Sequence, residues 1–220
     1  MWRRKPEFTL LTVVVLCAFC MAAVTTVNLS TQTYGAISKA QEPHGIVNFN
    51  SALQSQALVA ATNYYLTSSN LTLPATLVNG ITTSTVLTWH TVLTKTAGGT
   101  GAFSFIIYAG THGSTSDTAE VTQALPASTA VIDTMTVDVQ VAFTTVGSSG
   151  VFFWSIAPSH TAASAAGFGV TSGTVYTGTV SSFNTTTASL IFGLGITEAS
   201  GGTLPTVTVP TMQARSYNLD

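Results

Sequence analysis

Apolar and polar residues alternate along the chain from about residue 46 to residue 220, and no stretch there keeps the helical period of about 3.6 residues. The clearest alternation runs from Thr134 to Phe143. Side chains of a β-strand point to opposite faces in turn, so this run predicts a strand with one buried side and one solvent-facing side. The buried side would carry Met135, Val137, Val139, Val141 and Phe143.

Similar short runs fill the rest of this region, with turn-forming residues between them. Residues 103–109 are apolar on both faces, which predicts a strand that is covered more fully. Strands repeated at this spacing predict an all-β fold, a two-sheet antiparallel sandwich that is jelly-roll-like. Pro205 and Pro210 bracket the last run and predict that it is an edge strand or a strand ended by proline. The other predicted strands lie within Ile46–Asn50, Gln56–Tyr65, Asn70–Leu73, Thr82–Thr94, Ala119–Thr122, Val151–Ile156, Thr174–Ser182, Ser189–Thr197 and Thr206–Met212.

The N-terminal segment has a different pattern. Residues 8–27 form an uncharged apolar run that follows Arg3, Arg4 and Lys5. A helix of this length rises about 30 Å, the thickness of a bilayer core, and the basic flank predicts that the β region lies outside the cytoplasm. The same letters fit a signal peptide cleaved near Ala23, and they fit a helix buried inside an assembly. These three interpretations stay open.

The pattern therefore divides the chain into one N-terminal hydrophobic helix (residues 1–27), a polar tether (28–45) and a β-sandwich domain (46–220). Cys17 and Cys20 form a C-x-x-C pair inside the apolar run, without a second pair or a nearby histidine. We interpret them as small apolar side chains rather than as metal ligands or redox groups.

The amino-acid composition indicates which kinds of partner the surface of the domain can contact. Only 6% of the residues are charged, against about 25% in ordinary domains. Much of the difference is made up by 40 threonines, which suit a pleated surface and cost little to bury against a neighbouring subunit. Residues 46–220 hold two cations, Lys95 and Arg215, against six acidic residues, a net charge of −4. A nucleic-acid partner is excluded because no basic track is present.

One part of the domain resembles a known family. The segments YYLTSSNLTLPATL (64–77) and WHTVLTKTAGGTGAFSFIIYAGTHGSTSDTAEVT (89–122) are similar to a domain of tailed-bacteriophage virion structural proteins, found in fibre, decoration and minor structural polypeptides. Gly110–Ala119 matches the family's glycine- and SDTA-containing loop. The resemblance implies a jelly-roll-like domain that assembles in a virion, and the hydrophobic N-terminus departs from the family's pattern.

Few residues of the domain could carry catalysis. Its histidines are His90, His112 and His160, and its acidic residues are scattered. Hydrolysis needs an activated nucleophile or a pair of carboxylates. Asp133 and Asp138 are five residues apart, so they face opposite sides of a strand and cannot pair. We therefore predict no catalytic residue and no enzymatic activity.

A cation could be imagined only in the loop 110–119. His112, Asp117 and Glu120 are its possible ligands, and their spacing matches neither zinc nor EF-hand sites. Asp117 is better interpreted as an acceptor for the backbone of its own loop. Gly98–Gly101 joins two strands and is no phosphate loop. We predict no metal and no cofactor.

Aromatic side chains offer one further candidate, a sugar-binding platform at Tyr64-Tyr65 or Phe152-Phe153-Trp154. Neighbours on a strand face opposite sides, so at least one member of each group belongs to the core. Core packing is the interpretation we favour for both groups.

These observations together predict a non-enzymatic virion structural protein, a decoration- or fibre-type subunit. It would assemble as a homotrimer or larger, with other virion proteins, and could touch a membrane through residues 8–27. One alternative is a pilin-like subunit of a cell-surface filament. Another is a membrane-anchored carbohydrate-binding module with its β domain outside the cytoplasm, which would bind through Tyr64 or Trp154.

Overall fold

A computed structural model describes residues 47–50, 54–73, 81–160, 167–171, 173–199 and 204–217. They belong to one of the two units into which the chain divides, His44–Asp220. The predicted helix (1–27) and tether (28–45) lie outside the described residues. No helix within the described ranges has the length and apolar character needed to cross a membrane.

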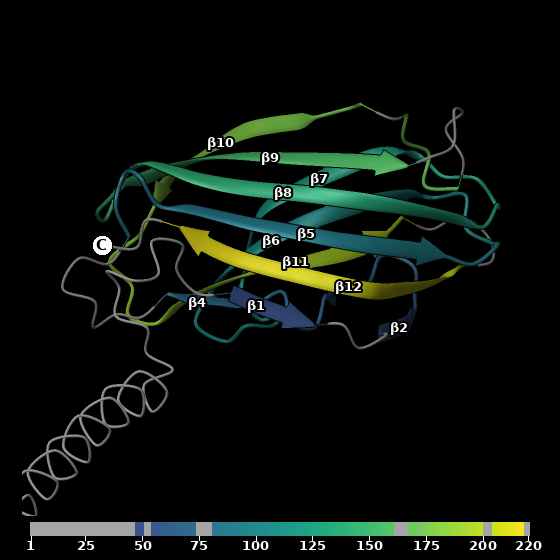
Figure 1. Cartoon of the computed structure of the whole chain (residues 1–220), viewed down its shortest axis with the longest axis horizontal. Coiled ribbons are helices and arrows are strands. Elements are labelled where there is room, and N and C mark those ends of the chain that lie inside the picture. Colours follow the sequence, from purple (N-terminus) through teal and green to yellow (C-terminus); the bar gives the residue numbers. More distant parts are fainter. Residues whose placement is uncertain are drawn as a thin grey trace, which may run out of the picture. The chain divides into compact units, whose positions relative to one another are not determined.

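Regular structure in the described residues consists of β-strands, as the period-two pattern predicts (Figure 1). The strands are β1 (Val47–Asn50), β2 (Gln54–Ala57), β3 (Tyr64–Tyr65), β4 (Leu71–Leu73), β5 (Val86–Lys95), β6 (Ala102–Gly110), β7 (Thr118–Ala127), β8 (Asp133–Thr145), β9 (Gly150–His160), β10 (Tyr176–Phe183), β11 (Leu190–Glu198) and β12 (Thr206–Tyr217).

The strands form two antiparallel sheets. Sheet A has the order β1-β12-β5-β8-β9-β10, with β2 also paired to β12, and sheet B has the order β3-β11-β6-β7, with β4 also paired to β11. The pairing is nested, because β5 pairs with β12 and the following strand β6 pairs with β11. The two-sheet antiparallel sandwich predicted from the sequence is confirmed.

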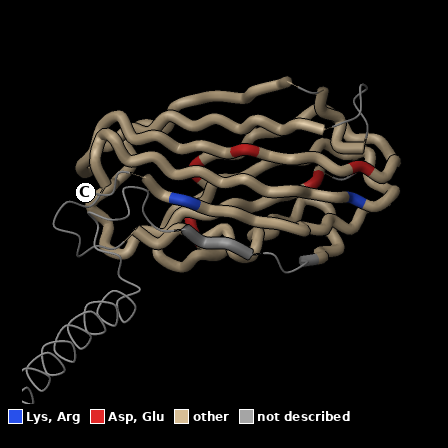
Figure 2. Tube along the Cα trace, in the orientation of Figure 1, with Lys and Arg blue, Asp and Glu red and all other residues tan. Residues whose placement is uncertain are grey.

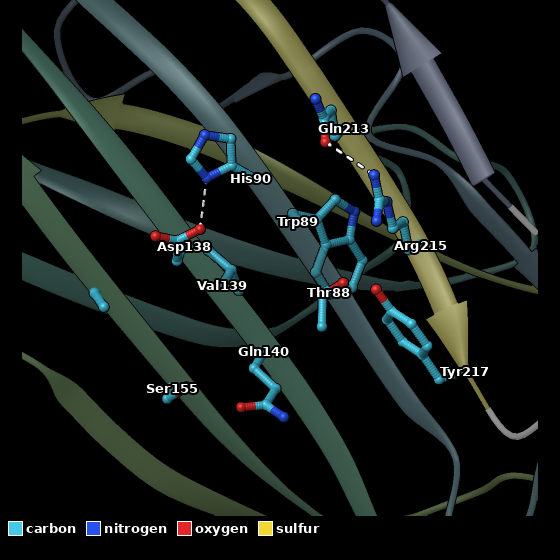
Figure 3. A pocket seen from close by; sticks show the side chains of 11 residues that line it. Thr88, Trp89, His90, Asp138, Val139, Gln140, Ser155, Gln213, Arg215 and Tyr217 are labelled. Atoms are coloured by element: carbon cyan, nitrogen blue, oxygen red, sulfur yellow. Dashed lines mark hydrogen bonds and ion pairs between the residues drawn. The ribbon is translucent and has the colours of Figure 1, made fainter. Parts of the chain in front are cut away.

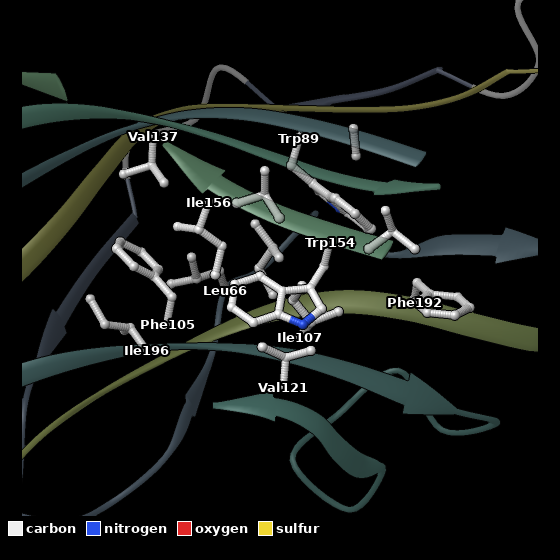
Figure 4. Close-up of a cluster of buried hydrophobic side chains, with 14 of the residues drawn as sticks. Leu66, Trp89, Phe105, Ile107, Val121, Val137, Trp154, Ile156, Phe192 and Ile196 are labelled. Carbon is white, nitrogen blue, oxygen red and sulfur yellow. The ribbon is translucent and has the colours of Figure 1, made fainter. Parts of the chain in front are cut away.

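The core lies between the two sheets (Figure 4). The predicted inward face of β8 is confirmed, since Met135, Val137, Val139, Val141 and Phe143 are all buried. Four phenylalanine rings, Phe143, Phe152, Phe183 and Phe192, pack with centroids 5.3 to 6.3 Å apart. Aromatic packing of this kind adds to the stabilisation that comes from burying apolar area.

Strand β6 is buried on both faces, as residues 103–109 predict. On its outward face Ile106 and Tyr108 are both 1% exposed. The rings of Tyr65 and Tyr108 lie 5.5 Å apart over β11, where Gly193 and Gly195 leave room for them. A Cβ atom at Gly193 would meet the Tyr65 side chain, so this covering depends on glycine at that position.

Two sequence predictions are wrong at the level of single strands. Gln56–Tyr65 is not one strand, because the chain turns at Ala60-Ala61 and continues in the other sheet. Ala61 has a φ of 53°, and its N–H donates to the carbonyl of Glu198 at 2.9 Å. The left-handed backbone at an alanine is a tertiary effect that the local pattern does not reveal.

The last strand is not an edge strand. β12 extends to Tyr217 and lies inside sheet A, with β5 on one side and β1 and β2 on the other. Pro205 precedes the strand, and Pro210 falls in the register shift between Thr208 and Thr211. Proline lacks the N–H that a ladder needs, and an irregularity in the ladder accommodates it inside a sheet.

Candidate functional site

A hollow of about 460 Å³ lies on the outer face of sheet A (Figure 3). Strands β5, β8, β9 and β12 form its base, and their outward side chains line it. Strand register explains which residues meet there. Gln213, His90, Asp138 and Ala157 form one row across the strands, and Arg215, Thr88, Gln140 and Ser155 form the next.

The hollow exists because three short side chains lie among longer ones in these rows. Thr88, Ser155 and Ala157 are short and half-buried, and they form the floor. Longer side chains stand around them, namely His90, Asp138, Gln140, Gln213, Arg215 and Tyr217. A flat sheet face with uniform side chains would offer no such depression.

His90 and Asp138 form the closest polar pair of the hollow. The Nδ1 of His90 donates to Oδ1 of Asp138 at 2.6 Å, and the side chains are 48% and 63% exposed. No hydroxyl or thiol is among the hydrogen-bond partners that the described residues give His90, and Asp138 is the one carboxylate among the lining residues. Neither an activated nucleophile nor a carboxylate pair is formed.

Arg215 stands on the opposite side of the hollow, on β12. Its Nη2 donates to Oε1 of Gln213 at 3.4 Å, a long hydrogen bond between exposed groups. Tyr217 lies two residues further along the same strand and presents its ring to the hollow (Figure 3). One side of the hollow therefore holds a cation and an aromatic ring, and the other holds the His90–Asp138 pair.

The loop between β6 and β7 is organised by Asp117, as predicted. Its carboxylate accepts hydrogen bonds from the backbone N–H groups of Thr111, His112, Gly113 and Ser114, at 2.6 to 3.3 Å. Burial by itself would raise the pKa of Asp117, but the hydrogen bonds from His112, Gly113 and Ser114 outweigh it and lower that pKa. The carboxylate is occupied by its loop, so this residue has a structural role.

The other acidic and histidine candidates are apart from one another. Asp133 is buried and accepts the Phe168 N–H at 3.1 Å, while Asp138 faces outward, so the two do not pair, as predicted. His160 is buried and its Nε2 donates to the carbonyl of Val170. No group of three or more potential metal ligands occurs among the described residues.

One end of the sandwich contains buried charges that the sequence did not single out. Lys95 is fully buried, and its Nζ donates to the carbonyl oxygens of Gly98 and Thr129, each at 2.7 Å. Glu198, also fully buried, lies close enough for its charge to oppose the fall in the Lys95 pKa that burial causes. Burial raises the pKa of Glu198. Lys95 joins two loops, and its role is structural.

Core packing, the interpretation favoured from the sequence, is confirmed for Trp154 and Tyr64, and the alternative of an aromatic platform at these two residues is wrong. Trp154 is 9% exposed and belongs to the core, and Tyr64 packs against the core. The cavity beside Tyr64 and Tyr65 measures about 80 Å³, well below the roughly 300 Å³ or more of ordinary ligand pockets. Period two explains the result, because Phe152 and Trp154 share the inward face while Phe153, 38% exposed, points out.

The sequence matches no protein-family model, and no curated protein is similar to it. Solved structures give weak matches. The CBM2 module of the evolved Dit of Lactobacillus casei BL23 phage J-1 is 9% identical, with a TM-score of 0.37 over 80% of this chain and 98% of that one. The Lotus tetragonolobus seed lectin is 8% identical, with a TM-score of 0.39 over 80% and 99%.

A chain of the infectious bursal disease virus Gt strain is 13% identical, with a TM-score of 0.30 over 78% of this chain and 33% of that one. Bacteriophage and virus chains are thus among the structures that match. Similarity at this level fixes neither a function nor a partner.

Proposed function

We propose that this chain is a non-enzymatic structural subunit of a virus particle, of the decoration or fibre type, that assembles with copies of itself and with other virion proteins. The observation that carries the proposal is the uncharged edge that strand β10 gives sheet A, where no other described strand pairs with it. The proposal is also supported by the virion-type segments at 64–77 and 89–122.

Strand β10 forms that edge. It pairs with β9 on one side, and no other described strand pairs with it on the opposite side. Its sequence, YTGTVSSF, has no charged residue, and the neighbouring Val175 is 57% exposed. An unpaired strand edge presents backbone donors and acceptors that another chain can use. Natural proteins commonly block such edges with charges or prolines, and β10 has neither.

The opposite sheet provides an internal contrast. β7 is one edge of sheet B, and it carries Glu120 and Pro126, two features that oppose pairing with a second chain. Of these two long edge strands, β10 is therefore the one suited to assembly, and the remaining edges among the described strands are formed by the short strands β1, β2, β3 and β4. Its own irregularity, between Val180 and Phe183, is confined to its C-terminal end.

The surface charge is compatible with close packing of subunits. The basic residues among the described ones are Lys95, which is buried, and Arg215 (Figure 2). Burying a neutral threonine-rich face requires no desolvation of ions, so contact between copies is inexpensive in free energy.

Fractionation of the natural source tests the proposal. Particles are purified on a density gradient, and peptides of this chain are quantified by mass spectrometry in the particle, envelope and soluble fractions. We expect the chain to sediment with the particles at several copies each. Recovery in the cell envelope alone would contradict the virion role and favour a pilin-like or membrane-anchored surface protein.

A further inference from the structure

The hollow on sheet A has the dimensions of a ligand site. Its volume of about 460 Å³ falls within the roughly 300–1,000 Å³ of ordinary small-molecule pockets. It is open on the solvent side and lined by side chains from separate strands of one sheet. Because a sheet held by ladders on both sides is rigid, these side chains are positioned before a ligand arrives.

The polar side chains of the hollow include both hydrogen-bond donors and hydrogen-bond acceptors. Arg215 supplies donors, Asp138 supplies acceptors, and the amides of Gln140 and Gln213 supply both. The His90–Asp138 hydrogen bond uses Nδ1 and Oδ1, so Nε2 and Oδ2 remain available to a ligand. A hydroxyl group is both donor and acceptor, and a ring bearing several hydroxyls would match this mixed lining.

The Tyr217 ring adds an apolar surface beside these groups (Figure 3). A sugar ring has hydroxyls at its rim and C–H groups on its faces, so it can use the ring and the polar groups together. An anionic ligand fits less well, because the carboxylate of Asp138 shares the hollow with the single cation, Arg215. A neutral sugar meets no such repulsion.

We propose that this hollow is a binding site for a neutral oligosaccharide, with Tyr217 as the stacking residue and Asp138, Gln140 and Arg215 as hydrogen-bonding residues. The ligand is bound and not cleaved. Glycoside hydrolysis usually needs two carboxyl groups flanking the bond, and Asp138 is the one that lines the hollow. The site goes beyond the proposed structural role, and the two can fail independently.

An array of neutral and acidic oligosaccharides tests the proposal. The labelled full-length chain is applied to the array, and the affinity for the best-bound oligosaccharide is measured by calorimetry. We expect binding to neutral members, competed by the same free oligosaccharide. Tyr217→Ala and Asp138→Asn should each lower the affinity about tenfold or more, since each removes a direct contact.

Thr136→Ala is the matched control, because Thr136 lies on the same face of β8 as Asp138 but outside the hollow. It should bind as the wild type does. Circular dichroism melting curves verify that each variant folds. Absence of binding to every oligosaccharide, a preference for acidic ones, or unchanged affinity in both hollow variants would overturn the proposal. None of these results depends on whether the chain belongs to a particle.

Discussion

A single carboxylate, that of Asp117, organises the loop between β6 and β7. Asp117 receives four backbone hydrogen bonds from its own loop, and its side chain is 1% exposed. This role was predictable because aspartate commonly caps a turn of its own chain. The role of Lys95 was not predictable, because Gly98 and Thr129, whose carbonyls it binds, lie 3 and 34 residues away in loops of unpredictable course.

Replacing Asp117 should make stability depend less on pH. Its folded pKa is lowered, so its stabilising contribution is present above the unfolded value of about 4 and is lost as the pH falls through the folded value. Asp117→Asn should therefore cost about 1–3 kcal/mol of unfolding free energy at pH 7, and the difference from wild type should shrink in acid. Urea denaturation at a series of pH values measures both.

Asp138→Asn serves as the control, since Asp138 is exposed and its surface pair contributes at most about 1 kcal/mol. A cost for Asp117→Asn that stays constant from pH 7 to pH 3 would contradict the role of the ionised carboxylate.

Lys95 should be among the most sensitive positions of the domain. Lys95→Met removes two hydrogen bonds to carbonyls and leaves Glu198 buried without its nearby positive charge. We expect a loss of about 3–5 kcal/mol in chemical denaturation. The double variant Lys95→Met/Glu198→Gln should recover part of that loss, and strict additivity of the two substitutions would show that the charges are not coupled.

At the scale of the strand, the sequence alone predicted which segments form strands better than it predicted which strands pair with each other. The inward residues of β8 followed from alternation because one face of that strand meets the core. The interior position of β12 did not follow. Pro210 is a strong local signal for an edge, yet the register shift at Thr208–Thr211 absorbs it. Whether a ladder is irregular depends on the partner strand, which the local sequence does not contain.

The hollow could not be predicted for the same reason. Thr88, Ser155 and Ala157 come from two strands that do not touch each other, and only the register with β8 between them brings the three together. In the sequence each is one small residue among many. The cross-strand register is the missing information, and it is fixed by packing across the whole sheet.

A charge on β10 should weaken self-association. Thr179 is an exposed residue of this edge. If β10 pairs with β10 of another copy, Thr179→Lys brings two positive charges together. If β10 pairs with a different strand, the substitution places a charge against a neutral strand. We expect the association constant to fall about tenfold or more in sedimentation velocity experiments. Thr122→Lys, the same change on the β7 edge, should leave association unchanged. Equal effects of the two substitutions would exclude β10 as the contact.

The molecule combines few charges, a neutral threonine-rich covering and, at β10, a long sheet edge without a charge or a proline. Association of such domains requires little desolvation of ions, because few charged side chains lie on the surface. Among the described residues, Asp138 is the one carboxylate that lines the hollow on sheet A, and its partner there is His90. Assembly and recognition use different surfaces, the β10 edge and the outer face of sheet A.

Assembly with copies of itself is the central claim, and the mass of the native species tests it most directly. Sedimentation equilibrium of the full-length chain in a density-matched detergent separates the mass of the protein from that of the micelle. We expect a discrete species of three or more copies that Thr179→Lys dissociates. A wild-type chain that remains a single copy at every concentration would contradict it.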